Sequence, residues 1–323
     1  MNFAAAKKID ASKIPVIDLT PLRDGTNPIT VAKALHAASK DLGFIYIKGH
    51  GIPEQVIENA RENALAFFSS SDDLKEAVRV SKKHRGWLSK GGAKMKDGAK
   101  PDLKESFIWG HPKFNGDELD NHPLRGENLW PSQFPHMEDY SMTYYKYAHE
   151  VAHHLMRGFA IALDLPEDFF LRSASRPLSR ASYVFYPSQS VEMEKNQFGV
   201  GPHTDFGVLT VLCQDCVGGL QVQDVNGTWL EAPPIEGTLI VNVADLLSRW
   251  TDGAYKSTPH RVINCSGKER LSIVLAFDPN PETRVDAKEV FGANYNSKYE
   301  PITCGDYLTW RFDKAFSYRK VLS

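Results

Sequence analysis

Three residues of the chain have the types and the spacing of a metal site. His203 and Asp205 stand two positions apart in the segment GPHTDFG, and His260 follows further along in STPHRV. On a strand or an extended turn, residues i and i+2 point to the same face, so both can reach one ion. Two imidazoles and one carboxylate form the facial arrangement that leaves coordination positions open, which suits catalytic Fe(II) better than a closed structural zinc site.

A second pair of polar residues interrupts an apolar run. Arg270 and Ser272 stand two positions apart in RLSIVLAF, so we predict that they share one face of a strand. A guanidinium that points into a β-core needs an anion, its fork matches a carboxylate, and a serine hydroxyl can donate to the same group. The pair therefore predicts a site for a dicarboxylate co-substrate, and the alternative is a buried Arg–Glu pair of purely structural use.

The apolar residues that must position these side chains follow two periods. Helical spacing dominates before about residue 180, with helices predicted over 31–42, 56–68 and 138–163, while strand-like runs dominate from there to about 282. Many short strands of this kind are typical of a sandwich or jelly roll. We predict a mainly β fold with flanking helices, divided into an N-terminal mixed region (1–175), a core (176–282) and a C-terminal extension with a helix (283–323).

Composition excludes several classes of partner. The 323 residues include 38 basic and 40 acidic side chains, a net charge of -2 that gives no footprint for sequence-independent nucleic-acid binding. The chain shows neither a signal peptide nor a stretch of 18 apolar residues, so we expect a cytoplasmic location and no membrane. A reducing compartment would keep its four cysteines as thiols. No feature of the sequence specifies an oligomeric state.

The motifs HTD, YKSTPHRV and RLS occur in an ordered set with IPVIDL, LGFIYIKGHGIP, FYP and GGLQV. This set resembles the isopenicillin N synthase-like family of iron(II) and 2-oxoglutarate-dependent dioxygenases over most of the chain. The resemblance implies a double-stranded β-helix, or jelly roll, with Fe(II) on His203, Asp205 and His260. It also implies that Arg270 and Ser272 bind the distal carboxylate of 2-oxoglutarate and that Tyr186 adds a phenol hydroxyl.

The implied reaction consumes O2 and 2-oxoglutarate, releases succinate and CO2, and oxidises a small organic molecule by hydroxylation, desaturation or ring closure. Ascorbate could serve as a reductant. An iron oxidase of the isopenicillin N synthase type, which does not use 2-oxoglutarate, resembles the same pattern and is the main alternative.

Two residues are candidates for contact with the substrate. Arg85 and Phe107 lie in a loop-rich segment that in this family approaches the substrate side. An arginine would suit an anionic substrate, and an aromatic ring would suit an apolar or cyclic body. The alternative is that both only pack within the loops.

The segment HEVAH, with His149, Glu150 and His153, fits the pattern of zinc hydrolases. At about 100° per residue these side chains point away from the apolar stripe centred on Ala148, so we predict a solvated helix face. A jelly roll that has lost catalysis and only binds a ligand is a further alternative, but it would leave the metal site and Arg270 costly to bury.

Overall fold

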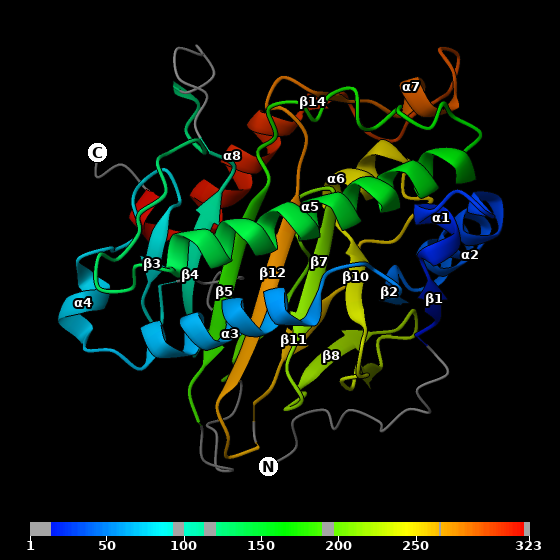
Figure 1. The fold of residues 1–323 in the computed structure, drawn as a ribbon. Helices are drawn as coiled ribbons and strands as arrows, with labels where there is room; N and C mark the ends of the chain where they lie inside the picture. The colour runs from blue at the N-terminus through cyan, green and yellow to red at the C-terminus, as the bar shows by residue number, and fades with distance from the viewer. Residues whose placement is uncertain (1–13, 93–99, 113–120, 189–196, 265, 320–323) are drawn as a thin grey trace.

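Two β-sheets form the centre of the structure, a computed structural model that describes residues 14–92, 100–112, 121–188, 197–264 and 266–319 (Figure 1). The larger sheet has the order β1 (Val16–Asp18), β2 (Phe44–Lys48), β10 (Leu239–Val243), β7 (Leu209–Gln214), β12 (Arg270–Phe277), β5 (Arg180–Tyr186), β4 (Glu105–Gly110) and β3 (Gly86–Leu88). The smaller sheet has the order β6 (Val200–His203), β11 (His260–Val262), β8 (Leu220–Gln223) and β9 (Trp229–Glu231). Side chains of both sheets line one cavity, so the sheets face each other and the predicted jelly-roll core is confirmed.

Helices α2 (Pro28–Asp41), α3 (Glu54–Phe68) and α5 (Met137–Ala162) pack on the larger sheet. The other helices are α1 (Thr20–Arg23), α4 (Asp72–Glu76), α6 (Asp245–Trp250), α7 (Ala287–Phe291) and α8 (Cys304–Ala315), followed by a 3₁₀ turn at Ser317–Arg319. In Figure 1, α5 and α3 cross in front of the sheet, whereas α8 lies behind it. A short ribbon of β13 (Arg284–Val285) and β14 (Ile302–Thr303) precedes α8. No helix of the described residues is long and apolar enough to cross a bilayer.

The central position of β12 in the sheet explains why its sequence is apolar and does not alternate with polar residues. It pairs with β5 on one side and with β7 on the other, both antiparallel. Helices cover one face of the strand and the cavity wall uses the other, so most of its residues are buried whichever way they point. A half-exposed strand would alternate polar and apolar residues, and β12 does not.

The predicted helices correspond to α2, α3 and α5. The stripe predicted on α5 is half-buried at Ala162 and buried at its other positions, namely Tyr144, Ala148, Val151, Leu155 and Phe159. The start of α2 is fixed by Asn27, whose side chain accepts from the backbone N–H of Thr30 at 3.3 Å. Burial of one apolar face against the sheet, together with a capped start, accounts for these helices.

The N-terminal region shares a sheet with the core. Strand β2 pairs with β10, and β4 pairs with β5, so the larger sheet continues across residue 175 without a break. Residues 1–175 therefore contribute strands to the core as well as helices that pack on it.

The two histidines of HEVAH are not on a solvated face, and that prediction was wrong. The ring of His149 lies 5.1 Å from that of Phe277 and the ring of His153 lies 5.6 Å from it, so both pack between α5 and β12. Only Glu150 is exposed. The face of α5 that packs on the sheet is wider than the stripe of apolar residues, because it also includes the two histidines.

Buried histidines predict that the protein loses stability on acidification. Burial lowers the pKa of His149 to about 3 and that of His84 well below its ordinary value of 6.5. The unfolded chain therefore binds more protons than the folded one as the pH falls below about 6.5, which costs up to about 1.4 kcal/mol per pH unit for each histidine. We expect Tm in scanning calorimetry to fall from pH 6.5 to pH 4.5, and less steeply in His149→Gln. A Tm independent of pH would contradict this assignment.

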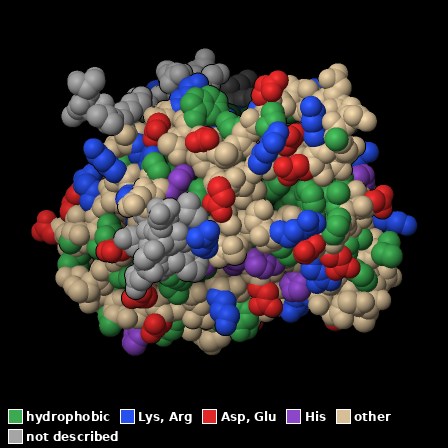
Figure 2. All heavy atoms as spheres, turned by 90° about the horizontal axis from the view of Figure 1, so that it is seen from above, with side chains coloured by type: hydrophobic (Ala, Val, Ile, Leu, Met, Phe, Trp, Pro, Cys, Tyr) green, Lys and Arg blue, Asp and Glu red, His purple; other side chains and the backbone are tan. Residues whose placement is uncertain are grey.

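The surface carries both signs of charge. On the face shown in Figure 2, Lys and Arg side chains are interspersed with Asp and Glu side chains, and they do not gather into a patch of one sign. A continuous basic stripe, which nonspecific nucleic-acid binding uses, does not occur on the visible part of this face.

Candidate metal centre and cavity

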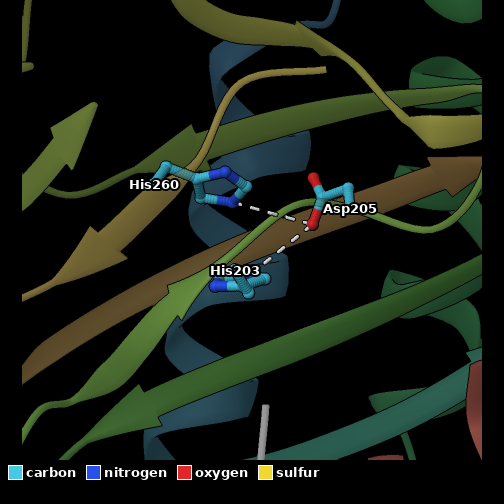
Figure 3. A group of neighbouring side chains, drawn as sticks. All are labelled: His203, Asp205 and His260. Carbon is cyan, nitrogen blue, oxygen red and sulfur yellow. Dashed lines mark ion pairs between the residues drawn. The ribbon is translucent and has the colours of Figure 1, made fainter. Parts of the chain in front are cut away.

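The smaller sheet brings the two predicted histidine ligands together. His203 ends β6 and His260 begins β11, and the two are directly paired across the strands. Asp205 lies in the turn after β6, and its Oδ1 is 3.7 Å from Nε2 of His203 and 3.6 Å from Nε2 of His260 (Figure 3). Among the described residues this is the only group of three or more His, Cys, Asp or Glu side chains placed to hold a metal ion. The described residues therefore contain no metal site for the zinc-hydrolase alternative.

Backbone carbonyls orient both imidazoles. Nδ1 of His203 lies 2.8 Å from the carbonyl oxygen of Gly201, and Nδ1 of His260 lies 3.2 Å from that of Thr258. Since a carbonyl only accepts, each Nδ1 donates and each Nε2 keeps a lone pair with which it could bind a metal ion. Burial lowers the pKa of His203, so its imidazole is neutral at pH 7 and ready to bind a metal.

The larger sheet holds the third candidate ligand, Asp205, in place. Oδ2 of Asp205 accepts from Oγ1 of Thr210 on β7 at 2.6 Å and from Nδ2 of Asn242 on β10 at 2.8 Å. Burial would raise the pKa of Asp205, but the neighbouring imidazoles and these two hydrogen bonds lower it. The carboxylate is therefore ionised, and its Oδ1 faces the two histidines.

A buried aspartate fixes the turn that carries Asp205. Asp278 follows β12, and its Oδ1 accepts from the backbone N–H of Val208 at 3.0 Å. A Cβ on Gly207 would lie 2.0 Å from the same oxygen, so the glycine of GPHTDFG is required by this close approach. Sequence analysis did not identify Asp278, Thr210 or Asn242. Asn242 could have been found from the sequence, because it is the polar residue within the apolar stretch LIVNV.

The hydrogen bond from Asn242 predicts a measurable effect on metal affinity. In Asn242→Leu the carboxylate of Asp205 keeps only one side-chain donor, and loss of an outer partner typically weakens metal binding about 10- to 100-fold. Anaerobic Fe(II) titration should show this change, while Asn226→Leu in an exposed turn should bind iron as the wild type does. Equal affinities for all three proteins would contradict the supporting role of Asn242.

The predicted co-substrate pair lies in the same cavity as the metal centre. Arg270 and Ser272 both line it, each with about 1% of its surface exposed. Arg270 pairs across the strands with Tyr186, and its guanidinium carbon lies 4.7 Å from the centre of that ring. All three guanidinium nitrogens and Oγ of Ser272 have no hydrogen-bond partner among the described residues. Such orphaned donors are costly to bury and fit a carboxylate ligand. The structural Arg–Glu pair considered above is absent from the described residues.

The two predicted substrate contacts are not at the cavity. Phe107 is fully buried on the other face of β4, with its ring 5.1 Å from that of Phe67 on α3. Arg85 is 2% exposed and donates to the backbone carbonyl of His84 at 3.0 Å. Side chains alternate along a strand, so the neighbours of Phe107 face the cavity in its place. The structure therefore favours the alternative, in which Arg85 and Phe107 only pack.

Several residues that sequence analysis did not identify line the outer part of the cavity, which has a volume of about 190 Å³. They come from β3, β4, β5, the turn after β6, the end of α8 and the residues beside these elements, and they are His84, Leu88, Lys104, Ser106, Ile108, Arg180, Phe206, Phe312 and Phe316. Helix α8 supplies Phe312, whose ring lies 5.7 Å from that of Phe206. The C-terminal extension thus forms one wall of the site.

Known proteins share both the sequence and the fold. Residues 14–133 match the family described as "non-haem dioxygenase in morphine synthesis N-terminal", and residues 176–279 match the "2OG-Fe(II) oxygenase superfamily". A homoarginine-6-hydroxylase of Glycine max is 32% identical over 321 residues, which cover 93% of this chain and 96% of the relative. The chain belongs to the 2OG-Fe(II) oxygenase superfamily.

This oxygenase is also similar to a solved structure and to a relative that is named as an oxidase. A full-length protein of Neurospora crassa, crystallised in complex with alpha-KG and thymine, has a TM-score of 0.84 and 27% identity, covering 93% of this chain and 96% of that one. A 1-aminocyclopropane-1-carboxylate oxidase of Dictyostelium discoideum is 32% identical, covering 84% of this chain and 83% of the relative. Alpha-KG is 2-oxoglutarate, and the protein is an Fe(II) and 2-oxoglutarate-dependent dioxygenase.

Proposed function

We propose that this dioxygenase oxidises a small organic molecule, by hydroxylation as the default reaction, with Fe(II) on His203, Asp205 and His260. Each turnover would insert one oxygen atom of O2 into a C–H bond of the substrate. The other oxygen atom would enter 2-oxoglutarate, which would leave as succinate and CO2. Desaturation or ring closure could occur at the same site, depending on which part of the substrate lies beside the metal.

The observation that carries the proposal is the orphaned guanidinium of Arg270 in the metal cavity. Its fork can bind the distal carboxylate of 2-oxoglutarate, and Ser272 can donate to the same group. Tyr186, which pairs with Arg270 across the strands, would add its hydroxyl. Together these residues would fix the orientation of the co-substrate toward the three metal ligands.

The chain's own residues have separate tasks in this reaction. Bound Fe(II) would supply the oxidising chemistry by bringing O2 and 2-oxoglutarate together at its open positions. The imidazoles and Asp205 leave those positions free, because the described residues supply only three ligands. Phe206 and Phe312 enclose the outer cavity and would keep water from the reacting atoms.

The relatives support a small molecule as the substrate. Thymine is bound in the Neurospora crassa structure, and homoarginine is named in the Glycine max hydroxylase. We propose that the substrate of this chain is also a small molecule. Ascorbate as a reductant and a cytoplasmic location are further parts of the proposal. The three described cysteines, Cys213, Cys216 and Cys304, are free thiols, which suits a reducing compartment.

Succinate formation tests this proposal. Protein reconstituted with Fe(II) and 2-oxoglutarate without oxygen should release succinate when O2 is admitted, slowly alone and faster with a suitable substrate. Omission of iron should remove the signal. Absence of iron-dependent succinate with and without a broad set of small molecules would overturn the proposal.

A further inference from the structure

The substrate side of the cavity holds one lysine, Lys104. Lys104 directly precedes β4 and lines the cavity. No described residue forms a hydrogen bond or an ion pair with its ammonium group. The carboxylate of Asp102 accepts from the backbone N–H of Gly201 at 3.0 Å and attracts the ammonium of Lys104 electrostatically, but Asp102 does not line the cavity. The three donors of Lys104 are therefore available to a ligand.

The chain places Lys104 beside the metal centre. The backbone N–H of Leu103 donates to the carbonyl of Phe198 at 3.0 Å, and Asp102 holds Gly201, so this segment runs along β6, the strand that ends in His203. The charge of Lys104 helps to lower the pKa of His203, although burial lowers it more. The ammonium therefore lies within electrostatic reach of the metal ligands.

The other charges of the cavity already have partners or assigned ligands. Nη1 of Arg180 lies 2.7 Å from Oδ2 of Asp278, which is completely buried. Arg270 faces the carboxylate of 2-oxoglutarate in the proposed function. Asp205, a metal ligand, is the only carboxylate among the described residues that line the cavity. Among the described residues that line the cavity, a cationic substrate would meet Lys104 and Arg180 with no acid beyond Asp205, whereas an anionic group would pair with Lys104.

Apart from His84 and Ser106, the rest of the outer cavity is apolar. Phe206, Phe312 and Phe316 lie on the side of α8, and Leu88 and Ile108 lie on the side of β3 and β4. The guanidinium carbon of Arg311 lies 4.1 Å from the ring centre of Phe206 and holds that ring in place from outside. Such walls suit a compact apolar or aromatic body.

We propose that Lys104 binds a carboxylate of the molecule that is oxidised, and that the substrate is a small carboxylic acid with a compact apolar or aromatic body. This inference rests on the proposed function and names the substrate class of the same site. Lys104 acts as a specificity determinant, because it would select the acid over the corresponding amide or amine.

Binding of matched probes tests the inference without turnover. Calorimetric titration of the anaerobic complex with Fe(II) and 2-oxoglutarate would compare benzoate with benzamide, phenylacetate with phenylacetamide, and cyclohexanecarboxylate with its amide, with benzylammonium as the cationic probe. We expect at least one acid to bind about 10- to 100-fold more tightly than its amide, as for a charge-assisted hydrogen bond in a buried site. Lys104→Met should lose this preference, Lys104→Arg should keep most of it, and Lys33→Met on the exposed face of α2 should leave it unchanged.

Four results would overturn the inference. Three of them are equal binding of acids and amides by the wild type, tighter binding of benzylammonium, and no measurable binding of any acid. Weaker binding of 2-oxoglutarate in Lys104→Met, with the acid preference intact, would also overturn it and assign Lys104 to the co-substrate. Acid binding through Lys104 without succinate formation in any assay would instead contradict the proposed function alone.

Discussion

Asp205→Ala should bind no Fe(II) at stoichiometric concentration and should form no succinate above background. The variant loses the only carboxylate of the metal centre and leaves two imidazoles, which hold Fe(II) weakly. The loss should exceed the about 10- to 100-fold effect of removing an outer partner, because a ligand itself is removed. Metal content after anaerobic gel filtration and succinate release on exposure to oxygen would measure both effects.

A matched substitution separates this effect from a general loss of stability. Asp168 on the surface is paired only with Arg172, both exposed, so Asp168→Ala should retain iron and activity. Iron binding in Asp205→Ala equal to that of the wild type would contradict the assignment of the metal centre. It would also reopen the search for ligands elsewhere in the chain.

Arg270→Leu should lose affinity for 2-oxoglutarate without losing iron. Removal of one member of a buried, hydrogen-bonded charge pair costs about 2–5 kcal/mol, which corresponds to an increase in Kd of about 30-fold or more. The apoprotein should not be destabilised, because its buried guanidinium has no described hydrogen-bond partner and the contact with the ring of Tyr186 offsets only part of its desolvation. We therefore expect an unchanged Tm without ligand and a strongly reduced rise in Tm on addition of 2-oxoglutarate.

The control for this prediction is Arg172→Leu, which removes an exposed arginine and should leave both Tm responses unchanged. If Arg270→Leu binds 2-oxoglutarate as tightly as the wild type, the co-substrate site is assigned incorrectly. If the wild type itself binds iron but neither binds nor consumes 2-oxoglutarate, the chain would act as an iron oxidase, as the likeness to the 1-aminocyclopropane-1-carboxylate oxidase allows.

The metal centre and the fold class were predictable because their signals are local. His203 and Asp205 share a face through the two-residue repeat of extended chain, and Arg270 with Ser272 stands out as a polar pair in an apolar strand. Orphaned donors now support the role assigned to that pair, which remains a prediction until its variants are measured.

The substrate side was not predictable in the same way. Phe107 and Ser106 are neighbours in the sequence, and only the pairing of β4 with β5 decides which of the two faces the cavity. A shift of one residue exchanges the two faces of a strand, so an aromatic residue in a predicted strand does not reveal its direction. The burial of the α5 histidines was not predictable for a similar reason, because the sheet covers a wider face of that helix than its apolar stripe indicates.

The sequence by itself therefore determined which residues could carry the chemistry of this protein: two histidines and one carboxylate spaced for a metal site and an arginine predicted to bind a dicarboxylate, carried by many short strands. Only the tertiary structure decided which distant residues support and surround that chemistry. Asn242, Lys104 and Phe312 line one cavity from separate parts of the chain, and Asp278 fixes the turn beside it; these positions depend on strand register and on the packing of α8. These contacts join residues far apart in the chain, and local periodicity carries no information about them.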